Sequence, residues 1–314
     1  VSTAWGPAVF SDGRPDPGTV DGAYRGLRFA RGVEAYVSLT PATSVEALAR
    51  GVRGLAGPGA HSAVVFEEML GPTPLYLTAN VDTVYAMAVA DLARDGPLVI
   101  EVPPGLGPSL VNDHFFRYVS DMGSSGPDAG QGGHYLLVPP NDGSFEGVPE
   151  GASNVAIELD GRPFYASRPR CHTNMVAFRG FLDDDGSPAA AVQTFREGLR
   201  IYPLAEGPGE MNWTDGSGVE FNTIGASNEM FFDELWAALQ GEAEGCFDPH
   251  LVGAAATLGI VDGAPFAPSE ALRQELRDIS AVGNSALRAL WFRPPESAYL
   301  FPNSTWAAPF QGGD

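Results

Sequence analysis

The chain has 314 residues, and its 18 basic and 39 acidic side chains give a formal net charge of −21. A protein this acidic is not expected to bind nucleic acid, because it would repel the phosphates. All of the basic residues are arginines, which excludes Schiff-base lysines and P-loop lysines. With 44% hydrophobic residues, the chain has enough apolar side chains for a sizeable core.

The N-terminal 60 residues predict an arm followed by two helices. The first twenty residues are rich in Gly, Pro, Asp and Ser, which is typical of irregular structure. Apolar spacing predicts a helix over about 24–38. Thr43 and Glu46 form a capping-box pattern at the start of a second helix, which Gly57 and Pro58 end.

Between residues 63 and 180 the apolar period changes toward 2, which indicates strands. Because no helix-length segment separates the strands, an antiparallel β-sandwich is favoured over parallel βαβ wiring. The longest run predicts one strand that carries Arg117 and Asp121 on the same face. The expected strands are 75–79, 83–90, 97–102, 109–120, 134–138, 154–159 and 174–180.

The C-terminal third again favours helices. A helix is expected after Ser187 as N-cap, and the Gly- and Asp-rich stretch 205–220 is expected to be a linker or a long loop. Asn228, Asp248 and Ser269 are start signals for three further helices. The chain is therefore expected to be an α+β protein with an antiparallel, jelly-roll-like β-sandwich between N-terminal and C-terminal helical subdomains. The expected boundaries are 1–60 for the arm and helices, 61–204 for the sandwich, and 205–314 for the helical segment and proline-rich tail.

Several classes of site are absent or weak. There is no GxSxG nucleophile elbow and no HExxH zinc motif. A metal held by His114 and His134 from neighbouring strands is conceivable, but half-buried sheet histidines are more common, so we expect no metal and no cofactor. Cys171 and Cys246 can either form one disulfide or remain two buried thiols. No apolar run reaches the roughly 18–20 residues that a membrane-spanning helix needs.

Polar groups within apolar strands give the candidate site. Asp82 or Asp121 is expected to act as general base, with Arg117 orienting the substrate or stabilising charge. Asn80 and Tyr85 are expected to bind substrate, although strict alternation points Tyr85 away from Asp82. The same contacts can instead satisfy a buried sheet. The candidate catalytic residues are Asp82, Asp121 and Arg117, and the candidate substrate-binding residues are Asn80, Tyr85, Asp128 and Arg179.

Eight segments carry, in this order, a resemblance to a known family: ANVDTVY, PLVIEVPP, DMGSSGPDAGQGGHYLLVPP, NMVAFRGF, LRIYPL, FNTIGASNEMFF, FDPHLVGAAATLGI and APFAPSEALR. The family is domain of unknown function 1254, together with the helical stretch that follows it in two-domain members. The resemblance implies a jelly-roll-like sandwich with a helical subdomain and favours a secreted or periplasmic location, but no activity is assigned to the family. Such proteins usually continue into a β-rich module, domain of unknown function 1214. The resemblance therefore implies either that a partner module or a homo-oligomer completes the protein, or that the chain is a fragment or a divergent form.

Three functions fit these observations. The first is a hydrolase that acts on a neutral or cationic small organic substrate through a cleft of carboxylates and arginines. The second is a carbohydrate- or lipid-binding module that uses the exposed aromatic side chains of Trp213, Trp291 and Trp306. The third is an interaction subunit that docks a β-rich partner module.

Overall fold

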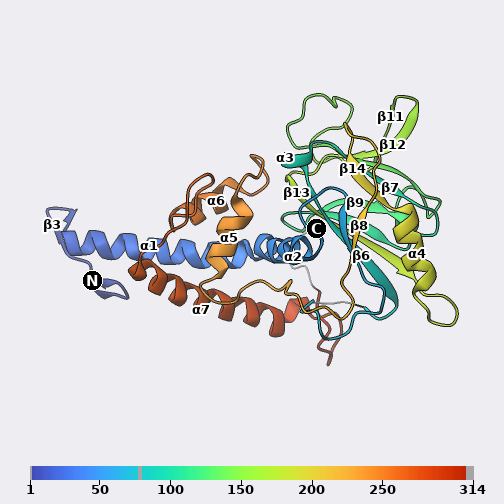
Figure 1. Cartoon of the computed structure of the whole chain (residues 1–314). Coiled ribbons are helices and arrows are strands. Elements are labelled where there is room, and N and C mark those ends of the chain that lie inside the picture. Colours follow the sequence, from blue (N-terminus) through green and yellow to red (C-terminus); the bar gives the residue numbers. More distant parts are fainter. Residues whose placement is uncertain (1, 77–79, 309–314) are drawn as a thin grey trace. The chain divides into compact units, whose positions relative to one another are not determined.

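The computed structural model describes residues 2–76 and 80–308 (Figure 1). The chain forms two compact units. The first unit comprises the described residues of 1–40, 226–233 and 250–314, and the second comprises those of 41–225 and 234–249. The α+β class predicted from the sequence is confirmed.

The second unit contains two β-sheets. A six-stranded sheet has the order β15-β5-β6-β13-β8-β9, and a five-stranded sheet has the order β11-β12-β10-β7-β14. Most neighbouring strands are antiparallel, as expected, but β10 pairs with β12 and β5 pairs with β15 in parallel. The bounds are β5 Ser62–Val65, β6 Thr83–Asp91, β7 Leu98–Val102, β8 Ser109–Asp113, β9 Tyr118–Met122, β10 Gly133–Leu137, β11 Val155–Leu159, β12 Arg162–Ser167, β13 Thr173–Phe181, β14 Arg200–Pro203 and β15 Asn212–Asp215.

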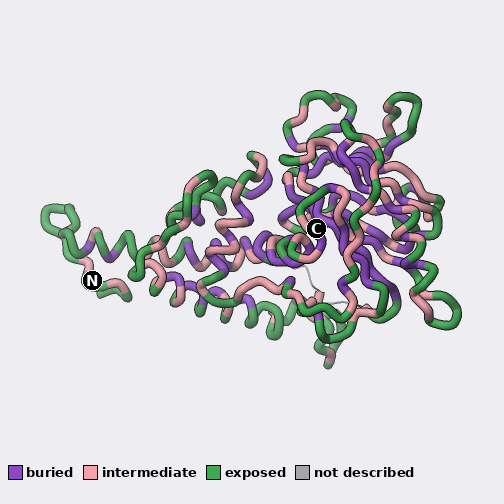
Figure 2. The backbone as a smooth tube through the Cα atoms, viewed as in Figure 1, coloured by how far each residue is buried: buried purple, intermediate pink, exposed green. Residues whose placement is uncertain are grey.

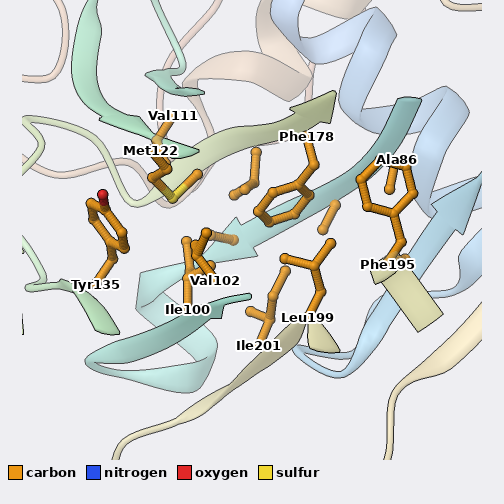
Figure 3. Close-up of a cluster of buried hydrophobic side chains, with 14 of the residues drawn as sticks. Ala86, Ile100, Val102, Val111, Met122, Tyr135, Phe178, Phe195, Leu199 and Ile201 are labelled. Atoms are coloured by element: carbon orange, nitrogen blue, oxygen red, sulfur yellow. The ribbon is translucent and has the colours of Figure 1, made fainter. Parts of the chain in front are cut away.

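The two sheets enclose a common apolar core (Figure 3). Ala86 and Phe178 come from the six-stranded sheet, and Ile100 and Ile201 come from the five-stranded sheet. Phe195, from α4 (Ala189–Gly198), is also fully buried in this cluster. Each large apolar side chain contributes roughly 1.5–3 kcal/mol on burial, so this layer holds the sandwich together. Figure 2 shows the buried residues gathered along the strands of this unit.

The run 109–120 is a hairpin, so the prediction of one long strand is wrong. The Asp113 carboxylate Oδ1 accepts hydrogen bonds from the backbone N–H groups of Phe115 and Arg117, at 2.8 and 3.0 Å. Phe116 takes the left-handed conformation with φ 62°. Asp113 thus closes a tight turn between β8 and β9, because an aspartate side chain can satisfy the turn's own N–H groups. Arg117 lies in that turn and does not share a strand face with Asp121.

Three other expectations about secondary structure are corrected. Helix α1 (Pro17–Ser38) begins earlier than expected, because Asp16 caps it by accepting from the Thr19 N–H at 2.6 Å. Helix α2 (Thr40–Ala56) begins before Thr43, which is buried inside the helix and is not its cap. Strand β15 lies within the stretch 205–220 that was expected to be a linker, because it pairs with β5.

The remaining strand and cap expectations differ only locally. Leu75 forms an isolated bridge with Asn222, and residues 77–79 of the expected strand 75–79 lie outside the described residues. Pro188, and not Ser187, occupies the N-cap position of α4. The Ser187 hydroxyl nevertheless accepts from the Ala189 N–H at 3.3 Å. The β-strands β11 and β13 fall close to the expected 154–159 and 174–180.

The first unit is built on the pairing of α1 with α7 (Glu270–Phe292). The predicted cap of α7 is confirmed, since Ser269 accepts from the Leu272 N–H at 3.3 Å. The helices approach closely where side chains are absent: a Cβ on Gly32 would lie 2.6 Å from Ile279, and one on Gly283 would lie 2.5 Å from Tyr36. The short elements of the two units together are β1 Ser2–Thr3, β2 Gly6–Pro7, β3 Phe10–Ser11, β4 Arg14–Pro15, α3 Leu92–Asp95, η1 Gly123–Ser125, α5 Phe231–Leu239, α6 Pro249–Ala256 and η2 Glu296–Ala298.

Within the described residues, no helix combines the length and the apolar character needed to cross a membrane.

Cys171 and Cys246 form a disulfide within the second unit, which decides the alternative that the sequence left open. The bond joins the segment after β12 to the segment after α5, and 75 positions separate the two cysteines. A crosslink that closes a loop of this length restricts the unfolded chain and stabilises the folded one by roughly 2–5 kcal/mol.

The double substitution Cys171→Ser with Cys246→Ser should lower the free energy of unfolding of the second unit by about 2–5 kcal/mol. Urea unfolding of the variant and of the wild type, each with and without reductant, measures this loss. Reductant should destabilise the wild type and leave the variant unchanged. Equal midpoints for all four samples would show that the bond does not constrain the chain.

Candidate functional site

A polar pocket in the second unit is lined by several charged side chains. Its volume is about 450 Å³. It is formed by α2, the end of β6, α3, the turn between β8 and β9, the start of β13 and the end of α5. Its lining residues are Glu46, Arg53, Asp91, Ala93, Arg94, His114, His172, Thr173, Ala237, Gln240 and Gly241.

His114 is the buried centre of this pocket's wall. Its side chain is 3% exposed and lies between two carboxylates. The imidazole Nδ1 is 2.8 Å from Glu242 Oε1, and Nε2 is 3.4 Å from Glu46 Oε2. Nε2 makes no hydrogen bond of good geometry among the described residues. The imidazole is therefore fixed on one side by Glu242 and faces Glu46 on the other.

Glu242 is held by three donors. Besides His114, its carboxylate accepts from the backbone N–H of His172 at 2.6 Å and from that of Thr173 at 3.0 Å. Burial by itself would raise the pKa of Glu242, but the hydrogen bonds from His114, Thr173 and His172 hold it below its ordinary value. Glu242 is thus an ionised carboxylate that is saturated with donors.

The same contacts keep His114 protonated. Burial would lower the pKa of His114, but the hydrogen bonds and charges of Glu242 and Glu46 outweigh it and raise the pKa to about 9. Glu46, with 14% of its side chain exposed, is the member of this trio that reaches the pocket most openly. The wall of the pocket therefore presents a carboxylate backed by an imidazolium.

Two guanidinium groups also line the pocket. Arg53 is 3.6 Å from Asp91 and Arg94 is 3.7 Å from Asp91. Arg94 also forms a bidentate pair with the adjacent Asp95. The pocket therefore combines carboxylates, guanidiniums and an imidazolium, which is the set of groups that acid–base catalysis with charge stabilisation uses.

Asn80, Tyr85 and Arg179, three of the residues expected to bind substrate, lie together elsewhere. Asn80 donates from Nδ2 to the Tyr85 hydroxyl, and its Oδ1 accepts from the backbone N–H groups of Asp82 and Thr83, at 2.9 Å each. The Arg179 guanidinium lies 5.6 Å from the Tyr85 ring centroid. Asn80 therefore shapes the entry to β6 with its own side chain.

Arg117 and Asp128 are engaged in contacts within the sandwich. Arg117 Nε donates to Asp113 Oδ2 at 2.8 Å, so its carboxylate partner is Asp113 and not Asp121. Its NH2 group donates to the backbone carbonyl of Cys246 at 2.5 Å. Asp128 is buried and accepts from the Tyr135 hydroxyl and from the Gly132 N–H, which holds the glycine-rich loop in place.

The two candidate general bases are not brought together. Asp121 pairs with Leu110 of β8, and Leu110 pairs with Ala177 of β13. Ala177 pairs with Met87 of β6, and Asp82 lies five residues before Met87 in the chain. The two backbones are therefore roughly 20 Å apart, because they are separated by three strand spacings of about 4.8 Å across the sheet and by five residues of about 3.3 Å along a strand. Partial burial raises the pKa of Asp121 above its ordinary value. Neither residue lines the His114 pocket.

The conceivable pairing of His114 with His134 is not formed. His114 lies in the turn after β8 of the six-stranded sheet, whereas His134 lies in β10 of the five-stranded sheet, 3.7 Å from Glu101. One grouping of potential metal ligands occurs in residues 2–76 and 80–308, namely Cys171, Cys246 and Glu242. Both of its sulfurs are in the disulfide, so they cannot act as thiolate ligands.

The sequence reasoning missed Glu46, His114 as an acid–base group, and Glu242. The Thr43 capping pattern assigned Glu46 to the helix start, although α2 begins earlier and leaves that side chain to face His114. The two cysteines could have indicated the position of Glu242. If they are paired, Glu242 is four residues from one sulfur and His172 adjoins the other, so the two segments must meet.

Comparisons with known proteins agree with this fold. Residues 64–203 match the model of the family described as "Protein of unknown function (DUF1254)", which confirms the resemblance seen in the sequence. No curated protein matches the chain. The crystal structure of the VPA0106 protein from Vibrio parahaemolyticus is similar, with 14% identity and a TM-score of 0.52. The match covers 84% of this chain and 59% of that one, and at this identity it shows the fold alone.

The His114–Glu242 pair should make stability depend on pH. Because the pKa of His114 rises from 6.5 to about 9 on folding, its stabilisation is complete below pH 6.5 and is lost as the pH rises through 9. The lowered pKa of Glu242 adds stability above its ordinary pKa, which is lost as the pH falls further. The free energy of unfolding of the wild type should therefore fall by at most roughly 3 kcal/mol between pH 6.5 and 9. His114→Gln should show a smaller fall, measured by urea unfolding over the same pH range.

His134→Gln is the matched control, because His134 also lies beside a glutamate but is 36% exposed. It should leave the pH dependence unchanged. An alkaline decline that persists in His114→Gln would assign the titration to another group.

Proposed function

We propose that this chain, whose residues 64–203 match the DUF1254 family of proteins of unknown function, is a hydrolase for a small organic substrate bound in the His114 pocket. The observation that carries the proposal is the trio of Glu46, His114 and Glu242, in which a buried imidazolium lies 3.4 Å from a carboxylate that lines the pocket. A carboxylate oriented in this way is suited to general base catalysis. The net charge of −21 favours a neutral or cationic substrate.

The proposed step starts with Glu46. Its carboxylate takes a proton from a water molecule while the water oxygen attacks the carbonyl carbon of the substrate. The tetrahedral oxyanion that forms is stabilised by Arg53 or Arg94, both of which line the pocket. Collapse of this intermediate breaks the bond to the leaving group, which receives the proton from Glu46. His114 acts as a positioning residue, because its imidazolium lies 3.4 Å from Glu46 Oε2 and orients that carboxylate.

Two further observations bear on the location of the protein and on its fold. The disulfide supports a location outside the cytoplasm, because such bonds persist in oxidising compartments. The two facing sheets, in which sequential strands are often not neighbours, are compatible with the jelly-roll-like wiring that the family resemblance implies. We retain both as hypotheses, together with a small-molecule substrate as the partner.

The proposal predicts that Glu46→Gln loses about 10²–10⁴-fold in kcat, because acid–base catalysis contributes about this much. The assay is a panel of p-nitrophenyl esters, monitored by release of p-nitrophenolate. His134→Gln should retain wild-type turnover. Asp82→Asn and Asp121→Asn test the placement inferred from the sequence. Loss of turnover in either variant, with normal turnover in Glu46→Gln, would place the site at that aspartate. Equal turnover in all four variants would exclude both placements.

A second candidate function, an interaction subunit, is favoured by exposed apolar side chains of the first unit. Trp291 is 62% exposed and Trp306 is 73% exposed, whereas Trp213 is partly buried against the sandwich core of the other unit. Two nearby stretches of chain thus present large apolar groups, which is unusual unless something covers them. The group is Leu290, Trp291, Phe292, Leu300, Phe301 and Trp306.

If this surface forms a homo-oligomer, Trp291→Ser combined with Phe301→Ser should reduce the solution mass toward that of one chain. Light scattering after size-exclusion chromatography measures the mass. Tyr24→Ser is the control, because Tyr24 is 69% exposed on α1. A wild type that has the mass of a single chain at every concentration would exclude self-association.

A further inference from the structure

A second, smaller pocket is also lined by residues of the β8–β9 hairpin. It shares no lining residue with the His114 pocket. Its volume is about 170 Å³. Three of its lining residues, Arg117, Arg168 and Arg170, carry guanidinium groups. In a chain with 18 basic and 39 acidic residues, this is a local reversal of charge.

Arg117 is held rigidly in this pocket. Its Nε donates to Asp113 at 2.8 Å, its NH2 group donates to the Cys246 carbonyl at 2.5 Å, and its guanidinium lies 5.3 Å from the Phe115 ring centroid. Asp113 is the carboxylate among the lining residues, and both of its oxygens already accept hydrogen bonds. It therefore has little capacity left to satisfy the other two arginines.

Arg168 is buried and keeps one donor without an acceptor. Its NH1 and NH2 groups donate to the backbone carbonyls of Asp142 and Phe145, at 2.7 and 2.9 Å. Its ion-pair partner Glu150 is 3.4 Å from NH1 and is 53% exposed. Its Nε has no hydrogen-bond partner within the described residues, although Arg168 is only 5% exposed. A buried donor without an acceptor costs roughly 1–3 kcal/mol, so an acceptor from outside the chain would be favourable.

Arg170 completes the set from the exposed side. Its guanidinium makes no hydrogen bond or ion pair with residues 2–76 and 80–308. The pocket thus contains two arginines fixed by the fold and one that is available to close on a ligand. Preformed donors of this kind reduce the entropy lost on binding.

We propose that this pocket is a binding site for a small oxyanion, namely a carboxylate or phosphate group. Guanidinium forks match the geometry of both groups and bind them through paired, charge-assisted hydrogen bonds. The volume is below the roughly 300–1,000 Å³ of pockets for drug-sized ligands, so the occupant is a small anion or the anionic end of a larger molecule. The site is separate from the proposed hydrolytic pocket, and neither depends on the other.

Isothermal titration calorimetry of the full chain with inorganic phosphate and with succinate, at constant ionic strength, tests the site. The wild type should bind at least one of the two anions. Arg170→Ala should weaken that binding about tenfold or more, since a charge-assisted hydrogen bond contributes roughly 1.5–3 kcal/mol. Arg170→Lys should recover only part of the loss, because lysine keeps the charge without the planar fork.

Arg162→Ala is the control, because Arg162 is an exposed arginine of β12 in the same unit and does not line the pocket. It should bind as the wild type does, and Glu46→Gln should also retain full anion binding, which separates this site from the proposed hydrolytic one. Binding of phosphate alone or of succinate alone identifies the preferred anion. The proposal is overturned if neither anion binds the wild type, or if Arg170→Ala and Arg162→Ala bind equally well.

Discussion

The buried carboxylate of Glu242 is the contact on which the arrangement around the His114 pocket depends. It accepts from His114 and from the backbone N–H groups of His172 and Thr173, and thereby joins the β8–β9 turn, the start of β13 and the segment after α5. A carboxylate without these donors would be too costly to bury. The disulfide between Cys171 and Cys246 fixes two of the same segments covalently, so charge and crosslink specify one geometry.

This constraint positions chemistry at the margin of an otherwise apolar sandwich. The core between the sheets supplies rigidity, while the polar groups occur where strands end and turns begin. Adjacent residues of one turn serve different pockets: His114 faces Glu46 and Glu242, and Asp113 holds Arg117. Because Asp113 closes the turn with its own carboxylate, the two pockets share a structural support without sharing a lining residue.

Much of the strand pattern could be predicted from the sequence, because alternation and turn residues are local properties. The expected strand 83–90 corresponds to β6 (Thr83–Asp91), and the predicted cap of α7 at Ser269 is confirmed. The long strand 109–120 could not be distinguished from a hairpin by alternation alone, since the turn depends on one aspartate side chain folding back on its own backbone. The capping pattern at Thr43 was misleading for the same kind of reason: helix α2 extends past a local start signal.

By itself, the sequence determined the α+β class, the similarity of residues 64–203 to the DUF1254 family and the excess of negative charge, because composition, periodicity and ordered motifs are readable along the chain. Only the tertiary structure decided which charged groups meet. Asp82 and Asp121 are kept apart by strand order, whereas Glu46, His114 and Glu242, separated by up to 196 positions, are brought within hydrogen-bonding or ion-pair distance. Such contacts depend on register and on long-range crosslinks, and neither leaves a periodic signal in the sequence.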